Sequence, residues 1–172
     1  VNRVQAERLK KLADYCHSHG RKFMFELLVP ATQEQLAQFG GSASRYDLEL
    51  RPSLMVQAMK ELQSAGVEAD VWKIEGIEKK QDCEKVAAQA HVDGRKNVGL
   101  IVLGRGENDE KVKLWLKTAA QVPGYVGFAV GRTIFWNPLK SVKDGKISRE
   151  QAAEQVAQNY KTFCDIWTQA RG

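Results

Sequence analysis

The stretch "EADVWKIEG" (residues 68–76) has the composition of a buried strand but carries a lysine at its centre. Val71, Trp72 and Ile74 are β-branched or aromatic residues, which strands favour. Lys73 lies among them, although a lysine buried in a strand is costly unless its charge is paired or neutralised. The run therefore predicts a strand whose lysine has either a charged partner or a chemical role.

Strand and helix patterns alternate on both sides of this run. Apolar strands are expected at 22–30, 69–75, 98–104 and 125–131, and amphipathic helices at 3–19, 51–66, 79–94, 107–121 and from about 148 to 170. Such alternation is typical of a parallel sheet covered by helices. The sequence therefore predicts a single α/β unit over residues 1–172, built of parallel β/α units in a small open sheet or part of a barrel.

Two segments depart from this alternation. Residues 31–50 are long, polar and contain glycine and serine, so we expect a loop that covers a site. Residues 133–139, "TIFWNPL", are expected to pack under the end of a barrel, with Pro138 stopping the chain there.

The composition is that of a soluble globular protein. The 172 residues are 43% hydrophobic and 27% charged, which suffices for one domain with a sizeable core. No apolar run approaches the ~20 residues of a membrane helix, and no signal peptide is visible. The net charge of +5 is spread along the chain without a dense basic run. We therefore expect neither nucleic acid nor a membrane as a partner.

The cysteines and histidines suggest no disulfide framework and no metal site. The cysteines lie far apart in helical patterns without a CxxC spacing, which favours a reduced, cytoplasmic compartment; they are Cys16, Cys83 and Cys164. The histidines fall near helix ends rather than at strand ends beside a second ligand; they are His17, His19 and His91. We expect no metal and no cofactor.

Charged residues occur at the expected carboxyl ends of the strands, where parallel β/α folds gather their chemistry. Side chains alternate across a strand, so Lys73 and Glu75 share the face opposite Trp72. Glu26 lies on the matching face of the first strand and is within reach of Lys73 if the two strands are neighbours, ~4.8 Å apart. A structural ion pair and a catalytic pair are both consistent with this spacing.

In the catalytic interpretation Lys73 is a Schiff-base nucleophile. Attack on a ketone requires the neutral amine, which burial and nearby cations favour. Arg105 and Arg132, just past the third and fourth strands, are candidates for those cations. Glu26 is the first candidate for shuttling protons during carbinolamine dehydration and C–C cleavage, and Glu75 is the second.

The last two strands end in residues suited to a phosphate. Glycine lets backbone N–H groups approach the anion, and arginine adds positive charge. The residues of these two kinds are Gly104, Arg105, Gly106, Gly131 and Arg132. "GRG" alone is a weak signal, because turns use glycine constantly.

These motifs resemble the last four strands of class I (β/α)8 aldolases. The resemblance covers almost the whole chain and is carried by "KFMFELLVP" (22–30), "DVWKIE" (70–75), "VGLIVLG" (98–104) and "GFAVGRTIFW" (127–136). The chain is similar to the tagatose-bisphosphate aldolase family and to the aldolase-like domain of unknown function fused to the sugar kinase of myo-inositol catabolism. The resemblance implies a TIM-barrel (β/α)8 fold, of which this chain covers the C-terminal half.

The resemblance also implies an activity, a class I aldolase that cleaves a phosphorylated ketose or keto-acid in carbohydrate catabolism. It makes Lys73 the Schiff-base residue and Glu26 the acid/base, and it assigns phosphate binding to 104–106 and to Gly131 with Arg132. One departure is "GRGEN" after the third strand, where relatives tend to have a small serine-containing turn. The alternative is a non-catalytic sugar-phosphate-binding or regulatory domain associated with a carbohydrate kinase.

A further departure is the missing first half of the barrel. The chain begins at Val1, not methionine, where the fourth helix of the barrel is expected, which suggests a processed chain or a fragment. A half-barrel has two open sheet edges, so we expect a homo-oligomer or an N-terminal half-barrel to cover them. On its own, such a half is expected to be inactive if it lacks essential residues.

Overall fold

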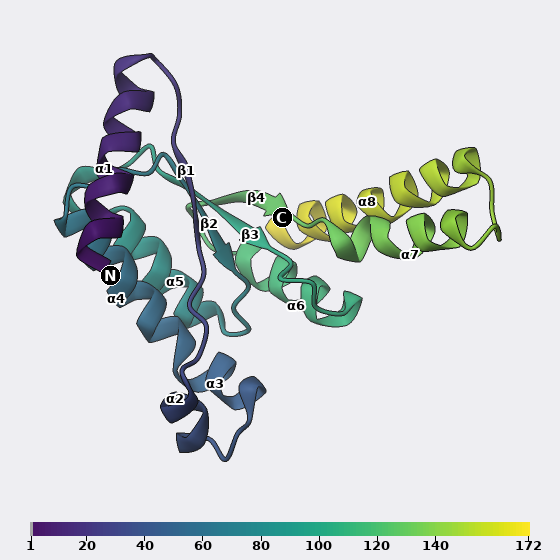
Figure 1. Ribbon diagram of the computed structural model, residues 1–172, viewed down its shortest axis with the longest axis horizontal. Coiled ribbons are helices and arrows are strands. Elements are labelled where there is room, and N and C mark those ends of the chain that lie inside the picture. Colours follow the sequence, from purple (N-terminus) through teal and green to yellow (C-terminus); the bar gives the residue numbers. More distant parts are fainter. Residues whose placement is uncertain (1) are drawn as a thin grey trace.

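Four parallel strands form the centre of the structure, a computed structural model that describes residues 2–172 (Figure 1). The strands are β1 (Met24–Leu27), β2 (Val71–Glu75), β3 (Gly99–Leu103) and β4 (Tyr125–Ala129), and they lie in the order β1-β2-β3-β4. All three pairings are parallel. The predicted α/β fold with a parallel sheet is therefore confirmed, although β1 and β4 are shorter than the apolar runs that predicted them.

The helices that connect and cover the strands follow local sequence signals. They are α1 (Asn2–Ser18), α2 (Gln33–Gln38), α3 (Ala43–Glu49), α4 (Arg51–Ser64), α5 (Lys80–Ala90), α6 (Asp109–Ala120), α7 (Arg132–Lys143) and α8 (Arg149–Arg171), with a 3-10 turn at Val92–Gly94. Pro52 lies in the first turn of α4, where its missing N–H costs nothing. The Ser148 hydroxyl and the Gln151 side chain form a capping box at the start of α8.

Residues 31–50 are not a plain loop, because they contain α2 and α3. Their polar residues are helix caps: Thr32 forms a capping box with Gln35, and the Ser42 hydroxyl accepts a hydrogen bond from the Arg45 N–H. Polar residues of this kind occur both in loops and at helix starts, which explains why a loop was expected where the structure has two short helices.

The expectation that Pro138 stops the chain is wrong, because α7 runs through it to Lys143. A proline inside a helix leaves the carbonyl four residues earlier without its usual donor. Here that carbonyl belongs to Ile134, and the side-chain amide of Asn159 on α8 donates to it at 2.8 Å. The α7–α8 pair, which projects to one side of the molecule in Figure 1, thus supplies the bond that the proline removes.

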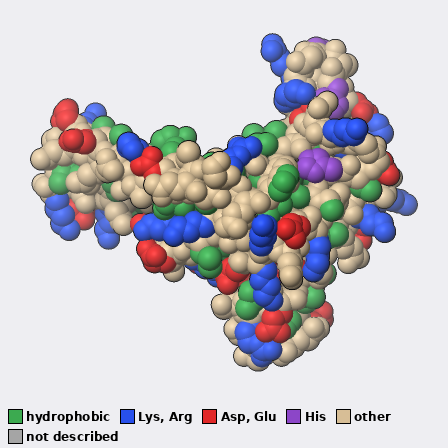
Figure 2. All heavy atoms as spheres, turned by 180° about the vertical axis from the view of Figure 1, so that it is seen from behind, with side chains coloured by type: hydrophobic (Ala, Val, Ile, Leu, Met, Phe, Trp, Pro, Cys, Tyr) green, Lys and Arg blue, Asp and Glu red, His purple; other side chains and the backbone are tan. Residues whose placement is uncertain are grey.

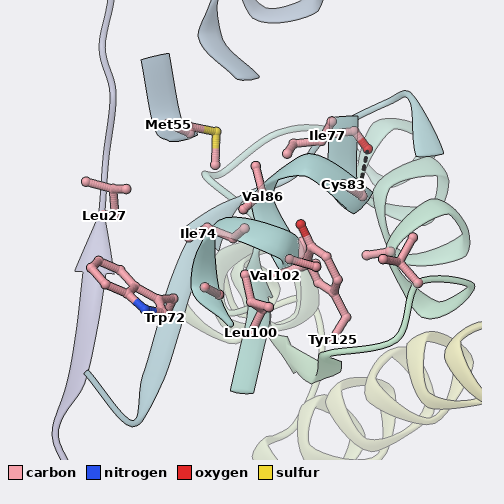
Figure 3. Packing of buried hydrophobic residues seen from close by; sticks show 14 of the residues in the cluster. Leu27, Met55, Trp72, Ile74, Ile77, Cys83, Val86, Leu100, Val102 and Tyr125 are labelled. Atoms are coloured by element: carbon pink, nitrogen blue, oxygen red, sulfur yellow. Dashed lines mark hydrogen bonds between the residues drawn. The ribbon is translucent and has the colours of Figure 1, made fainter. Parts of the chain in front are cut away.

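The two faces of the sheet differ sharply in exposure. Trp72 and Leu100 are at most 1% exposed and pack with helix residues such as Met55 and Val86 (Figure 3). On the opposite face Met24 is 54% and Val126 is 55% exposed. The core therefore lies between the sheet and its helices, while the other face and the outer edges of β1 and β4 have no partner within residues 2–172. No helix in this range is long and apolar enough to cross a membrane.

Asp70 joins the amino-terminal ends of β1 and β2. Its carboxylate accepts hydrogen bonds from the Phe23 N–H at 2.8 Å and from Lys22 Nζ at 2.9 Å, and His17 Nε2 lies 2.8 Å away. Partial burial raises the pKa of this carboxyl, but the Phe23 N–H, Lys22 and His17 outweigh burial and lower the pKa to about 2 from an ordinary 3.8. The ionised form of Asp70 therefore stabilises the fold.

Asp70→Asn is expected to lower the free energy of unfolding at pH 7 by about 1 to 2 kcal/mol, because charge-assisted hydrogen bonds are lost. Because folding lowers the pKa of Asp70, the difference in unfolding free energy between the unaltered protein and Asp70→Asn is complete above about pH 4. It disappears as the pH falls through about 2. Urea unfolding at a series of pH values measures it. Asp14→Asn, which removes an exposed partner of Lys10, is the control and should change stability little. A stability difference between the two proteins that persists at pH 2 would contradict the stabilising role of the ionised Asp70 carboxylate.

Candidate functional site

A shallow hollow at the carboxyl end of the exposed sheet face contains nearly all the predicted site residues. Its cavity volume is about 280 Å³. Predicted residues that line it are Glu26, Lys73, Gly104, Arg105, Gly106, Gly131 and Arg132, and they are joined by Leu103, Ala129, Thr133 and Phe135. Sequential parallel strands bring these segments together, because every carboxyl end meets the same edge of the sheet. Of the predicted residues, Glu75 alone does not line the hollow.

Lys73 and Glu26 are direct neighbours across β1 and β2. They are register partners in the parallel ladder, and Lys73 Nζ donates to Glu26 Oε2 at 2.7 Å. Their side chains are 25% and 45% exposed. The predicted adjacency on the face away from the helices is therefore confirmed, but Lys73 is only partly buried, because no layer within residues 2–172 covers this face.

This pair has the geometry needed for proton transfer. An amine and a carboxylate at hydrogen-bond distance can exchange a proton directly, and the open side of the hollow leaves room for a carbonyl compound to approach the amine. A partly exposed ion pair contributes little to stability. Stability alone is therefore a poor reason for the two charges to occupy this face.

Glu75 is on the same strand as Lys73 but has a different environment. Its side chain is 4% exposed, and its Oε2 accepts a hydrogen bond from the Val29 N–H at 2.8 Å. Arg105 Nη1 lies 3.2 Å from Glu75 Oε1, and Arg51 Nη1 lies 3.8 Å from Oε2. Glu75 therefore binds the backbone just after β1 and pairs with two arginines, whereas Glu26 is the carboxylate beside the Lys73 amine.

We call the group Asp47, Arg51, Glu75 and Arg105 the buried ion cluster. Arg51 Nε donates to Asp47 Oδ1 at 3.0 Å and Arg51 Nη2 donates to the carbonyl of Gly76 at 2.9 Å. Arg105 Nη1 donates to both Asp47 oxygens at 3.0 Å. The cluster joins α3 and the start of α4 to the carboxyl ends of β2 and β3.

Sequence reasoning missed Asp47 and Arg51. The available signal was their spacing, since a carboxylate and an arginine four residues apart form an ion pair on one helix face. That signal is common on exposed helices and does not distinguish a buried pair from a solvated one. Both side chains are at most 3% exposed here.

The turn after β3 contains Arg105 and lies against the side chain of Arg132. Arg105 has a left-handed backbone with φ 53, and Gly106 follows with φ 79. A Cβ on Gly106 would lie 2.6 Å from Arg132 Nη2, so glycine is what lets the Arg132 guanidinium approach this turn. The structure thus gives Gly106 a role in packing, and its predicted role in phosphate binding stays a prediction.

The charge around the hollow is local rather than part of a broad basic surface. Partial burial alone lowers the pKa of Arg105, but pairing with Asp47 and Glu75 outweighs it and raises the pKa. On the face shown in Figure 2, lysine and arginine side chains are scattered among acidic and neutral ones. Within residues 2–172, His, Cys, Asp and Glu form no group of three that could hold a metal ion.

Comparison with known proteins gives one family match. A family model described as "Uncharacterized protein conserved in bacteria (DUF2090)" matches residues 1–171. No curated protein matches the chain.

Proposed function

The chain belongs to the DUF2090 family, and we propose that it acts as a class I, Schiff-base-forming aldolase on a phosphorylated ketose or keto-acid. The observation that carries this proposal is the 2.7 Å contact between Lys73 Nζ and Glu26 Oε2, in a hollow that two arginines also line. The resemblance of the four strand motifs to class I aldolases supports it independently.

In the proposed reaction Glu26 first accepts a proton from the Lys73 ammonium group. The neutral amine adds to the substrate carbonyl, and the resulting carbinolamine loses water to give a protonated imine. The imine withdraws electrons as the C–C bond breaks, while a base removes the proton from the hydroxyl group on the departing carbon. Glu26 is the nearest carboxylate to Lys73 for these transfers. Bond cleavage leaves an enamine, which takes up a proton on carbon to re-form the imine. Hydrolysis of that imine then releases the second carbonyl product and the free Lys73 amine.

The anionic end of the substrate would lie on the β3 and β4 side of the hollow. Arg105 and Arg132 line that side, together with Gly104, Gly106 and Gly131. Arginine binds phosphate through charge-assisted hydrogen bonds. Lys73 and these residues line the same small cavity, so a short phosphorylated sugar or keto-acid could contact both.

We propose, further, that the sheet is the C-terminal half of a (β/α)8 barrel. Three features support this: the strands follow sequence order, all are parallel, and the charged pair faces away from the helices. The exposed side chains of Met24 and Val126 and the free edges of β1 and β4 would then be covered by an N-terminal half-barrel or by another copy of the chain.

Reductive trapping tests the proposed function. The natural protein is treated with sodium borohydride in the presence of a panel of ketose phosphates and phosphorylated keto-acids, and its peptides are analysed by mass spectrometry. We expect a substrate-dependent adduct on the peptide that contains Lys73, and none in Lys73→Met. If Lys73 stays unmodified with every compound while sugar phosphates still bind, the chain is instead a non-catalytic sugar-phosphate-binding domain, as expected of one associated with a carbohydrate kinase.

A further inference from the structure

The buried ion cluster lies beside the hollow, and Arg105 is the member of the cluster that also lines it. Asp47 is its centre: the side chain is 3% exposed, with Arg51 Nε at 3.0 Å, Arg105 Nη1 at 3.0 Å and Lys111 Nζ at 3.8 Å. Two buried carboxylates, Asp47 and Glu75, share the two arginines Arg51 and Arg105. The second arginine, Arg105, comes from the turn after β3 and therefore needs an explanation of its own.

Arg105 balances the charge of the two buried carboxylates, but charge balance does not explain why this arginine also lines the hollow. Taking charges out of water costs several kcal/mol per ion, and a buried ion pair is often no more stable than apolar residues of similar volume. Arg105 also adopts a left-handed backbone, with φ 53, which costs a non-glycine residue about 1 kcal/mol or more. A strained residue that is held by a buried carboxylate at the edge of a cavity is typical of a positioned functional group.

The contacts of Arg105 leave part of its guanidinium available to a ligand. Only Nη1 is used, by both Asp47 oxygens at 3.0 Å and by Glu75 Oε1 at 3.2 Å. Within residues 2–172, the Nε and Nη2 groups of Arg105 make no hydrogen bond. The side chain is 32% exposed and lines the same hollow as Lys73. Nε and Nη2 together form the edge of the guanidinium that binds two oxygens of one oxyanion.

We infer that Asp47 is a positioning residue, which fixes Nη1 of Arg105 so that Nε and Nη2 bind a phosphate group in the hollow. Helix α3, within a segment that looked like a loop, then supports the binding site through the contact of Asp47 with Arg105. The inference rests on the proposed function only for the nature of the substrate, because phosphate binding requires no imine.

Isothermal titration calorimetry with inorganic phosphate tests this inference on the natural protein. Asp47→Asn and Arg105→Gln are each expected to weaken phosphate binding about tenfold. Because Asp47 acts through Arg105, the double variant should bind no more weakly than Arg105→Gln alone. Glu49→Gln is the matched control on the same helix: Glu49 is exposed, pairs with Arg45, and should leave phosphate binding unchanged.

Arg105→Lys provides a second test that does not depend on Asp47→Asn folding. A lysine keeps the charge but has no fork that can bind Asp47 and a ligand at once, so we expect it to bind phosphate as weakly as Arg105→Gln does. Any of three results overturns the inference: no phosphate binding by the unaltered protein, full affinity in Arg105→Lys, or additive losses in the double variant. The outcome of borohydride trapping does not depend on these phosphate-binding results, so failure of the aldolase proposal and failure of the Asp47 inference can be distinguished.

Discussion

Lys73→Ala is expected to abolish carbon–carbon bond cleavage of a phosphorylated ketose or keto-acid, because no other amine replaces the nucleophile. Glu26→Gln is expected to slow cleavage by about 10²- to 10⁴-fold, the usual effect of removing a group that transfers protons. Binding should be largely retained in Glu26→Gln, since the carboxylate is on the Lys73 side of the hollow and the arginines are on the other. Steady-state kinetics with the compound that traps best measures both effects.

The loss of activity in Lys73→Ala can be separated from a loss of folding. Lys73 and Glu26 are 25% and 45% exposed, so breaking their ion pair should cost less than about 1 kcal/mol of stability. Unfolding in urea should therefore be nearly unchanged. Lys60→Ala, at an exposed position on α4, is the matched control and should keep full activity. Unchanged cleavage in Lys73→Ala would reject the enzyme proposal, and full activity in Glu26→Gln would show that Glu26 does not transfer the protons.

Gly76→Ala is expected to destabilise the fold by about 3 kcal/mol or more, a large part of the 5–15 kcal/mol typical of a domain. A Cβ at this position would lie 2.0 Å from the indole Cδ2 of Trp115, whose side chain is fully buried. The backbone cannot easily move away, because the carbonyl of Gly76 accepts a hydrogen bond from Arg51 Nη2 at 2.9 Å. Urea unfolding followed by circular dichroism measures the change.

Gly127→Ala is the control for this prediction. Gly127 lies in β4, where an added Cβ meets no atom within 4 Å and where the backbone is not left-handed. We expect its stability to stay within about 0.5 kcal/mol of the unaltered protein. If Gly76→Ala unfolds at the same urea concentration as Gly127→Ala, the close packing of Trp115 against Gly76 is wrong.

Much of the fold followed from local patterns. Alternation of apolar strands with helices predicted a parallel sheet, and the strands are neighbours in sequence order. Because side chains alternate with a period of two, the face of Lys73 and Glu26 was fixed once their strands were known to pair. The helices expected from 51 and from about 148 begin where Pro52 and Ser148 provide local start signals, since capping depends on only a few adjacent residues.

Features that depend on contacts between distant segments could not be predicted from local sequence patterns. Asp47 and Arg105 are 58 residues apart, and Asn159 reaches the carbonyl of Ile134 from 25 residues away. The first contact joins an apparent loop to the candidate site, and the second lets α7 continue past Pro138. Neither pair has a sequence signature, because each depends on how separate helices pack.

The sequence by itself therefore determined the order of the four strands and of the helices α1, α4, α5, α6 and α8, the parallel sheet, and the strand face that carries Lys73 and Glu26. These features follow from short-range periodicity. Only the tertiary structure decided that Lys73 is partly exposed, that Glu75 is buried and that Arg105 is held by Asp47. Exposure and ion pairing depend on which surfaces meet in three dimensions, and the burial of a charge is set by every element that packs around it.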